Sequence, residues 1–500
     1  MLRLPQRYFR FLFKLTFATL AMLPAAAQTQ PTPTPQAHPI ATQTLLPSVQ
    51  PLPVGQVIDD VQCAADSTET YALYLPSGYA SAKSWPIIYV FDPEARGKVP
   101  VTLYKDAAEK YGFVLAASND SRNFQGDAAS RAARAVWDDT HARLSLDPRR
   151  IYTMGFSGGA RVATALAVRC EACAVAGVIS HGAGYPFPPT EKEHFAYFAF
   201  IGDHDFNWPE IMELRLKKEE WPAPYRLRVF SGQHEWAPSA IFAEALEWLE
   251  LKAMQTGAIP RDPAFIDRRF TRTQKEAEGA AQRNDTIAEF DAYRSLVLDF
   301  AGLRDVAQSQ AKLSALKDSR ELKEAVKKQQ GAIDQQRALT QELSSDLAQA
   351  AGAGSELQLS LRAAIADGMT GLKFKAAHAK TEDERLILTR AFDQLWVQGI
   401  EAGQAELERA KHLDKADFYF SLMSAVTPNE PWPKLLLAET AAAKGDKKRA
   451  NKDLRDAIKS GLKNPDTIDK DANLQSLRND PEFQRIVAEL KARRASQPVQ

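Results

Sequence analysis

The 500-residue sequence predicts an α/β domain built on a mainly parallel sheet with helices on both faces, followed by an all-helical domain. Between residues 55 and 258, short apolar runs alternate with amphipathic segments of helical period. Continuous apolar strands are typical of parallel sheets that helices cover on both faces. From about Asp262 the strand pattern stops, and residues 262–500 become charged, rich in Ala and Leu, and helical.

The expected elements of the first domain follow this alternation. Strands are expected over residues 71–75, 86–91, 113–117, 151–154, 174–179, 196–201 and 225–230. Helices are expected over residues 101–111, 128–144, 160–168, 208–217 and 240–253. Active sites of such sheets collect at the carboxyl ends of the strands, so functional residues should directly follow strands.

The N-terminal sequence is typical of an exported protein. Residues 1–27 combine a basic start, an apolar stretch over residues 15–23 and a small-residue cleavage site, which predicts a signal peptide. A retained membrane anchor is the alternative, although the apolar stretch is short for a span. Residues 28–54 are rich in Pro, Thr and Gln and predict an extended linker. We expect a periplasmic or secreted protein without a stable membrane span after cleavage.

Composition limits the partners that this chain can have. It carries 63 basic and 63 acidic side chains, without the basic excess that nucleic-acid binding requires. Its cysteines, Cys63, Cys170 and Cys173, predict a structural disulfide, with Cys63 bonded to either partner or Cys170 bonded to Cys173. His and Cys residues lack the spacing of a metal site, so neither a metal nor another cofactor is expected.

The stretch Gly155-Phe156-Ser157-Gly158-Gly159 organises the first domain. It follows a β-branched and aromatic run and opens onto an Ala-rich helix, which is the context of a G-x-S-x-G nucleophile elbow. The serine of an elbow has a positive φ, and the flanking glycines let the strand and helix backbones approach each other. The alternative is a Gly-rich turn with a buried serine.

Two more polar motifs follow expected strands. Gly202-Asp203-His204-Asp205 follows the strand at 196–201, and Gly232-Gln233-His234 follows the strand at 225–230. Together with Ser157 they give the order serine, acid, histidine, which differs from the orders of the chymotrypsin and subtilisin classes. Three such residues on three strand ends favour nucleophilic catalysis.

On these motifs, residues 55–258 resemble an α/β-hydrolase of the secreted esterase and dienelactone-hydrolase-like kind. The resemblance implies that Ser157 is the nucleophile, His234 the general base and Asp205 the acid that orients His234. Asp203 is the alternative acid. The chemistry agrees, because a serine hydroxyl needs an adjacent base, and a buried carboxylate fixes the tautomer of that base.

The oxyanion hole departs from the common esterase pattern, because no His-Gly-Gly stretch follows the strand at 86–91. One donor is expected to be the backbone N–H of Gly158. The second should come from the backbone of residues 91–94, where Pro93 has no N–H and Asp92 is the candidate. The stretch 181–184 (His-Gly-Ala-Gly) resembles an oxyanion motif but follows the wrong strand, so we interpret it as a loop that could line the pocket.

The sequence allows two interpretations for each of two other features near the predicted site, residues 119–123 and Trp236. The polar residues 119–123 follow a strand and either contact substrate or form a hydrogen-bonded loop. Trp236 is either a pocket wall or a packed aromatic. The short spacing between Ser157, Asp205 and His234 leaves no room for a large lid, which predicts an open cleft.

The second domain shows a repeat. Ala416, Phe420 and Pro428 recur with a period of 34 as Ala450, Leu454 and, three positions late, Pro465. Over about residues 395–490 the chain therefore resembles tetratricopeptide repeats, which implies a protein-binding surface. The alternative is a helical bundle that packs on the first domain. All expected catalytic residues precede Asp262.

The sequence thus predicts an exported serine hydrolase, most simply a carboxylic-ester hydrolase that forms an acyl-enzyme. Its expected substrate is a small-molecule or polymer-attached ester, and a protein partner is expected at the helical repeats. Two alternatives remain: a serine peptidase of the same fold, and a catalytically silent scaffold whose repeats bind a protein partner.

Overall fold

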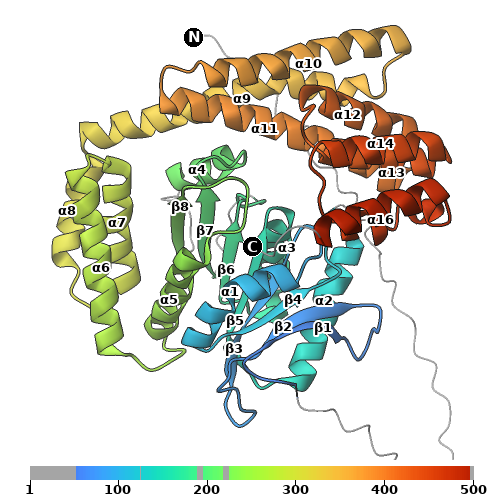
Figure 1. Ribbon diagram of the computed structural model, residues 1–500. Coiled ribbons are helices and arrows are strands. Elements are labelled where there is room, and N and C mark those ends of the chain that lie inside the picture. The colour runs from blue at the N-terminus through green and yellow to red at the C-terminus, as the bar shows by residue number, and fades with distance from the viewer. Residues whose placement is uncertain (1–51, 124–125, 188–194, 218–223, 496–500) are drawn as a thin grey trace, which may run out of the picture. The chain divides into compact units, whose positions relative to one another are not determined.

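The structure is a computed structural model that describes residues 52–123, 126–187, 195–217 and 224–495 (Figure 1). From Pro53 onward these residues form one compact unit. The predicted signal peptide (1–27) and linker (28–54) lie outside the described residues, except for residues 52–54. Among the described residues, no helix is both long enough and apolar enough to cross a bilayer.

Eight strands of the described chain form one sheet, in the order β1-β2-β4-β3-β5-β6-β7-β8 (Figure 1). The strands are β1 Val57–Gln62, β2 Thr70–Tyr74, β3 Trp85–Phe91, β4 Val114–Ser118, β5 Leu146–Phe156, β6 Gly177–His181, β7 Ala196–Gly202 and β8 Tyr225–Phe230. β2 pairs antiparallel with both β1 and β4, and the pairs from β4 through β8 are parallel. The carboxyl ends of β3 to β8 therefore meet at one edge.

Helices cover both faces of this sheet. They are α1 Lys98–Tyr111, α2 Asp127–Arg143, α3 Gly158–Arg169, α4 Trp208–Leu216 and α5 Ser239–Thr256, with a short 3-10 turn, η1 Glu171–Cys173. Side chains of each strand alternate between faces. Ile88 packs in the core with Trp248 of α5, whereas the hydroxyl of the next residue, Tyr89, lies 2.7 Å from Thr140 Oγ1 of α2. We call residues 57–256 the sheet region.

The predicted fold class is confirmed for this region. All seven predicted strands are present, and six of them have shifted ends. The eighth strand, β1, was missed because its sequence lacks a continuous apolar run. Asp59 and Asp60 interrupt it and are exposed at the edge of the sheet.

From Pro263 to Ala495 the described residues form helices only, and we call this part the helical region. Its helices are α6 Pro263–Gln282, α7 Thr286–Phe300, α8 Ala307–Lys317, α9 Arg320–Ala350, α10 Ser355–Ala377, α11 Glu382–Ala405, α12 Leu413–Val426, α13 Trp432–Ala443, α14 Lys447–Lys459, α15 Asp466–Asp469 and α16 Pro481–Ala495, with the short turns η3 Glu406–Ala410 and η4 Gln475–Leu477. Helices α9, α10 and α11 lie side by side, and α9 contacts α4 of the sheet region (Figure 1). The predicted all-helical second half is confirmed.

Small residues let the later helices of this region pack closely. Ala416 and Ala450, which the predicted period relates, are both fully buried. A Cβ added to Gly403 of α11 would lie 2.4 Å from the ring of Phe420 of α12, so these helices approach more closely than an alanine would permit. Helices α13 and α14 contact each other across a short connection at residues 444–446. The tetratricopeptide identity of the helices stays a prediction.

The cysteines take one of the pairings that the sequence left open. Cys170 and Cys173 form a disulfide directly after α3. Cys63 is buried and has a free thiol, and burial raises the pKa of this thiol to about 12. Cys63 therefore stays protonated at neutral pH, and its unreactive thiol belongs to the core.

Candidate active site

The turn after β5 has the geometry of a nucleophile elbow. Ser157 has φ +52° and ψ −120°, between the end of β5 at Phe156 and the start of α3 at Gly158. A Cβ added to Gly155 would lie 2.2 Å from the carbonyl oxygen of Gly159, so the strand and the helix can cross here only without a side chain. A positive φ in a non-glycine residue is strained, and such strain concentrates at functional sites.

The predicted acid and histidine lie in contact. His234 Nδ1 is 2.9 Å from Asp205 Oδ2, and the backbone N–H of Asn207 donates to Asp205 Oδ1 at 2.8 Å. Asp205 is fully buried. Burial raises the pKa of its carboxyl group, and the hydrogen bond to His234 acts in the opposite direction. The pair therefore has the arrangement in which a carboxylate fixes the orientation of an imidazole.

The alternative acid, Asp203, has a different environment. Its Oδ1 accepts a hydrogen bond from the backbone N–H of Gly232 at 3.1 Å, and its side chain is 35% exposed. This contact joins the loop after β7 to the loop after β8. The geometry therefore favours Asp205 as the partner of His234 and gives Asp203 a role in holding the two loops together.

Ser157 and His234 both lie next to the turn at the end of β6. The backbone N–H of Ser157 donates to the carbonyl oxygen of His181 at 2.8 Å. At the next residue, an added Cβ on Gly182 would lie 3.0 Å from Asp205 Oδ2 and 3.1 Å from His234 Cε1. In the described chain Ser157 Oγ makes no hydrogen bond to His234. Catalytic hydrogen bonds of this kind are often long before substrate binds.

The histidine at the end of β6 is a structural residue. His181 is fully buried, the backbone N–H of Ala237 lies 3.3 Å from its Nδ1, and its Nε2 has no hydrogen-bond partner in the described residues. Burial lowers the pKa of His181 to about 3, so its imidazole is neutral. The stretch 181–184 thus serves the site through Gly182, which leaves room for Asp205 and His234.

The two predicted oxyanion donors, the N–H groups of Gly158 and Asp92, belong to backbone segments that lie in close contact. A Cβ added to Gly159 would lie 2.1 Å from the carbonyl oxygen of Phe91 and 3.2 Å from the backbone nitrogen of Asp92. The start of α3, with the backbone N–H of Gly158, therefore abuts the end of β3. This is the arrangement that an oxyanion hole needs, and the role of the two N–H groups stays a prediction.

The Asp92 side chain fixes the loop after β3, which the sequence did not reveal. Its buried carboxylate accepts hydrogen bonds from Arg96 Nε at 2.9 Å, from the backbone N–H of Glu94 at 2.9 Å and from Trp236 Nε1 at 3.1 Å. Trp236, for which the sequence allowed a pocket wall or a packed aromatic, is a packed aromatic and is 8% exposed. Through it the loop of the predicted oxyanion hole is tied to the loop that carries His234.

The polar residues after β4 divide between two roles. Asn119 Nδ2 and Asp120 Oδ2 bond to Thr70 and form a hydrogen-bonded loop. Asn123 instead faces the elbow, because a Cβ added to Gly158 would lie 1.7 Å from Asn123 Oδ1. Asn123 is thus positioned beside the predicted nucleophile and one predicted oxyanion donor.

Side chains of the helical region reach the loop that carries Asp205. We call residues 202–208 the acid loop. Arg390 Nε of α11 donates to the carbonyl oxygen of Asp203 at 2.7 Å, and Gln336 Nε2 of α9 donates to the carbonyl oxygen of Phe206 at 3.0 Å. These contacts bring the helical region to the carboxyl edge of the sheet, and the open cleft stays a prediction. Sequence reasoning missed both residues because their partners lie more than a hundred positions away.

One face of α11 is directed at the site. Arg390, Asp393 and Glu401 share that face at helical spacing. Burial raises the pKa of Asp393 to about 6, and the negative charge of Asp205 adds to this rise. Burial also raises the pKa of Glu401, and the charges of Arg161 and His234 oppose it. The electrostatic surroundings of the predicted triad therefore include carboxyl groups from the helical region.

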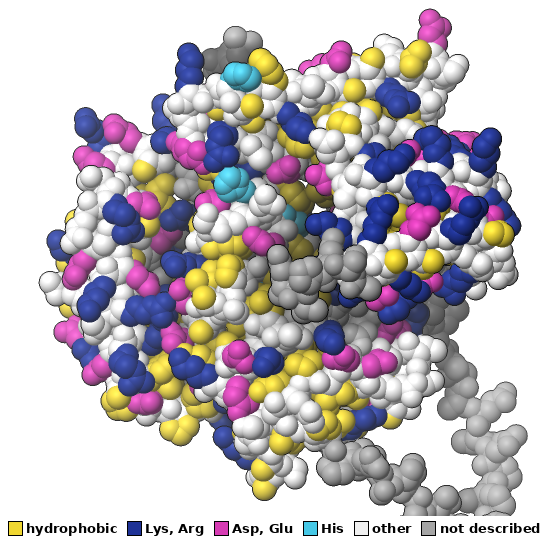
Figure 2. Space-filling model, in the orientation of Figure 1, with side chains coloured by type: hydrophobic (Ala, Val, Ile, Leu, Met, Phe, Trp, Pro, Cys, Tyr) yellow, Lys and Arg dark blue, Asp and Glu magenta, His cyan; other side chains and the backbone are white. Residues whose placement is uncertain are grey.

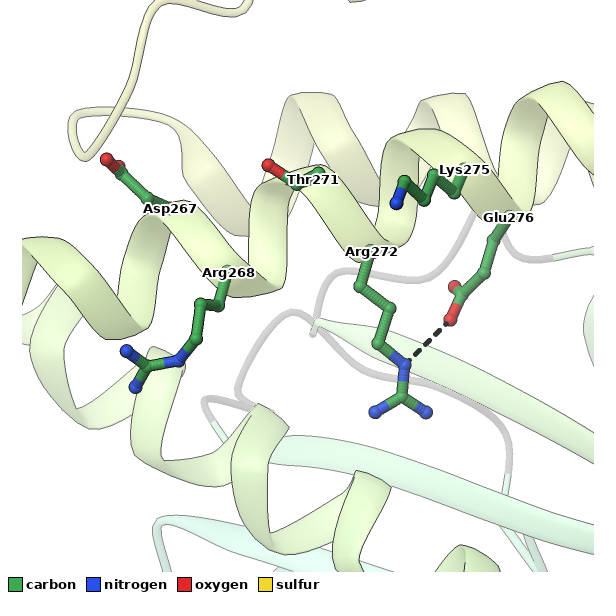
Figure 3. A pocket seen from close by; sticks show the side chains of 6 residues that line it. All are labelled: Asp267, Arg268, Thr271, Arg272, Lys275 and Glu276. Atoms are coloured by element: carbon green, nitrogen blue, oxygen red, sulfur yellow. Dashed lines mark ion pairs between the residues drawn. The ribbon is translucent and has the colours of Figure 1, made fainter.

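Two grooves on the surface lie away from this site. A groove of about 670 Å³ is lined by six side chains of α6 alone, and Arg272 there pairs with Glu276 at 3.3 Å (Figure 3). A second groove, of about 550 Å³, follows α14 and α16, where Lys and Arg side chains gather (Figure 2). In both grooves charged side chains pair with one another across a helical surface, an arrangement typical of a solvated face.

Comparisons with known proteins give structural likenesses only. No protein-family model matches the sequence, and no curated protein matches it. An S-formylglutathione hydrolase from Staphylococcus aureus is 12% identical, and the match covers 36% of this chain and 90% of that chain, with a TM-score of 0.31. A carboxylesterase from a metagenomic library is 13% identical, with 42% and 91% covered and a TM-score of 0.32. An esterase from Mycobacterium marinum is 17% identical, with 39% and 81% covered and a TM-score of 0.32.

Proposed function

We propose that this protein is a serine hydrolase that cleaves carboxylic esters through an acyl-enzyme. The observation that carries the proposal is the contact between Asp205 and His234 at the same sheet edge as Ser157, whose backbone is held at positive φ. Ser157 is the nucleophile, His234 the general base, and Asp205 the acid that orients it. The N–H groups of Gly158 and Asp92 receive the oxyanion.

The chemistry follows from these roles. His234 accepts the proton of Ser157 Oγ as the oxygen attacks the ester carbonyl, and the N–H donors stabilise the oxyanion. The oxyanion collapses, the bond to the alkoxy oxygen breaks, and His234 returns the proton to the leaving alcohol. Water then attacks the acyl-enzyme with His234 again as base, which releases the acid and restores Ser157.

Export remains part of the proposal. The disulfide between Cys170 and Cys173 supports it, because disulfides persist mainly outside the cytoplasm. The N-terminal residue of the protein recovered from the periplasm or the culture medium would show whether the predicted signal peptide is removed.

A fluorophosphonate probe tests the enzymatic proposal directly. The full-length protein should gain one covalent adduct, and Ser157→Ala should lose the adduct and lower kcat on p-nitrophenyl acetate by about 10⁴–10⁶. Ser121→Ala is the matched control, because Ser121 is another buried serine, three residues after the end of β4, and should keep full labelling. Equal labelling of Ser157→Ala would remove Ser157 from the mechanism. A folded wild-type protein without labelling or turnover would favour the silent scaffold.

A further inference from the structure

The acid loop is anchored at two backbone carbonyls that flank Asp205. Arg390 holds the carbonyl oxygen of Asp203, and Gln336 holds that of Phe206, at 2.7 Å and 3.0 Å respectively. Both donors come from the helical region, on α11 and α9. The residue between these anchors is the one whose carboxylate contacts His234.

Arg390 is buried without a carboxylate partner among the described residues. It is 4% exposed, and its guanidinium carbon lies 4.2 Å from the centre of the Trp208 ring. Burial lowers the pKa of Arg390 to about 10, against the opposing charges of Asp203 and Asp205. Burying a charge that is paired only with a carbonyl and a ring costs free energy. If this contact served packing alone, an apolar side chain would fill the space at lower cost.

Burying Gln336 also costs free energy of folding. It is fully buried, and its Oε1 has no hydrogen-bond partner in the described part of the chain. An unpaired buried acceptor destabilises a fold. Two contacts compensate: Nε2 donates to the carbonyl oxygen of Phe206 in the acid loop at 3.0 Å and, over a longer distance of 3.4 Å, to Gln394 Oε1 of α11. The shorter of the two ends on the acid loop.

A shift of the acid loop would disturb His234 in two ways. Asp205 Oδ2 lies 2.9 Å from His234 Nδ1, and the Phe206 ring centre lies 4.2 Å from the His234 ring centre. Both contacts come from adjacent residues of one loop. A misplacement of about 1 Å in a catalytic group can lower a rate by on the order of 10²-fold.

We propose that Arg390 and Gln336 are positioning residues, through which the helical region holds the acid loop in the geometry that orients His234. The inference rests on the proposed function, because it assigns these residues to the triad of a serine hydrolase. It makes the helical region a structural part of the active centre, although no bond-making group comes from it.

The first test compares two arginines of equal burial in the full-length protein. Arg269 of α6 is also 4% exposed and binds the sheet region through Glu247 of α5 at 2.7 Å, away from the acid loop. Arg390→Gln should lower kcat on p-nitrophenyl acetate by on the order of 10²-fold with little change in KM. Arg269→Gln should lower stability and leave kcat within about 2-fold. Arg390→Lys, which keeps a donor for Asp203, should recover part of the lost kcat.

The second test separates activity from stability. Gln336→Leu removes the donor to Phe206 and the long contact to Gln394, together with the unpaired Oε1, so the midpoint of urea unfolding should change little. Its kcat should nevertheless fall about 10-fold, in line with the loss of one hydrogen bond to a loop that bears the acid. The measurement remains decisive if Arg390→Gln does not fold.

The outcomes distinguish the two proposals. If the wild-type protein is neither labelled by a fluorophosphonate nor active on the ester, the proposed function fails and the inference falls with it. If the wild-type protein is active, and both Arg390→Gln and Gln336→Leu keep the kcat of Arg269→Gln, the inference alone is wrong. In that case the helical region only packs against the acid loop.

Discussion

The sheet region and the helical region contribute to the candidate site in different ways. The sheet region places each predicted catalytic side chain directly after a strand, and glycines allow the backbones to meet there. The helical region contributes side-chain donors that end on backbone carbonyls of the acid loop. The sheet region holds the groups proposed to make and break bonds, and the helical region holds the loop that carries the orienting acid, Asp205.

This difference shows which contacts determine the site. Within the sheet region the supporting contacts are redundant, as at Asp92, whose carboxylate accepts hydrogen bonds from three residues, Glu94, Arg96 and Trp236. The support that the acid loop receives from the helical region is sparse, since Asp203 and Phe206 each receive one donor from it in the described chain. Substitutions in the sheet region should therefore have the larger effects on the chemistry. Substitutions in the helical region should act through the acid loop.

The largest effect is expected at the acid itself. Asp205→Asn should lower kcat by on the order of 10⁴, because an amide at this position favours the wrong tautomer of His234. Asp203→Asn should cost at most about 10-fold, since the Asp203 side chain accepts a hydrogen bond from the backbone of Gly232, whereas Asp205 contacts His234. Steady-state kinetics of both variants on p-nitrophenyl acetate would decide between them. A reversed order would make Asp203 the acid and would contradict the geometry described here for Asp205.

A smaller effect is expected where two loops of the sheet region are tied together. Trp236→Phe keeps a packed ring but removes the hydrogen bond from Nε1 to Asp92 Oδ2. The free energy of unfolding should fall by about 1–3 kcal/mol, as for other hydrogen bonds to a charged group. Urea unfolding monitored by circular dichroism would measure this. Because Asp92 keeps its other donors, kcat should fall far less than in Asp205→Asn, and an equal loss would show that the support is not redundant.

Much of the sheet region could be predicted from the sequence because its signals are local. The elbow at Ser157 needs glycines within two residues, and Asp205 and His234 follow apolar strands whose ends must meet at one edge. The support from the helical region has no such local signal. The sequence of α11 indicates a buried face, but an arginine on that face does not reveal that its partner is a carbonyl 187 residues away. Asn123 was missed in part because only the fold brings its loop to the elbow.

The smallest expected effect tests whether α11 covers the acid loop at all, through the pH dependence of stability. In the folded protein the pKa of Asp393 is about 6, because of burial and then the charge of Asp205, and an unfolded aspartate titrates near 4. Because the folded protein favours the protonated form of Asp393, this carboxyl group contributes stability that is fully present below about pH 4. That contribution is lost as the pH rises through about 6. Asp393→Asn should raise Tm at pH 8 and leave it unchanged at pH 4.

Asp414→Asn is the control, because Asp414 is exposed and Lys444 lowers its pKa, so its replacement should not raise Tm. An Asp393→Asn protein with an unchanged Tm at pH 8 would mean that this face of α11 is solvated, and the helical region would then lose its proposed hold on Asp205.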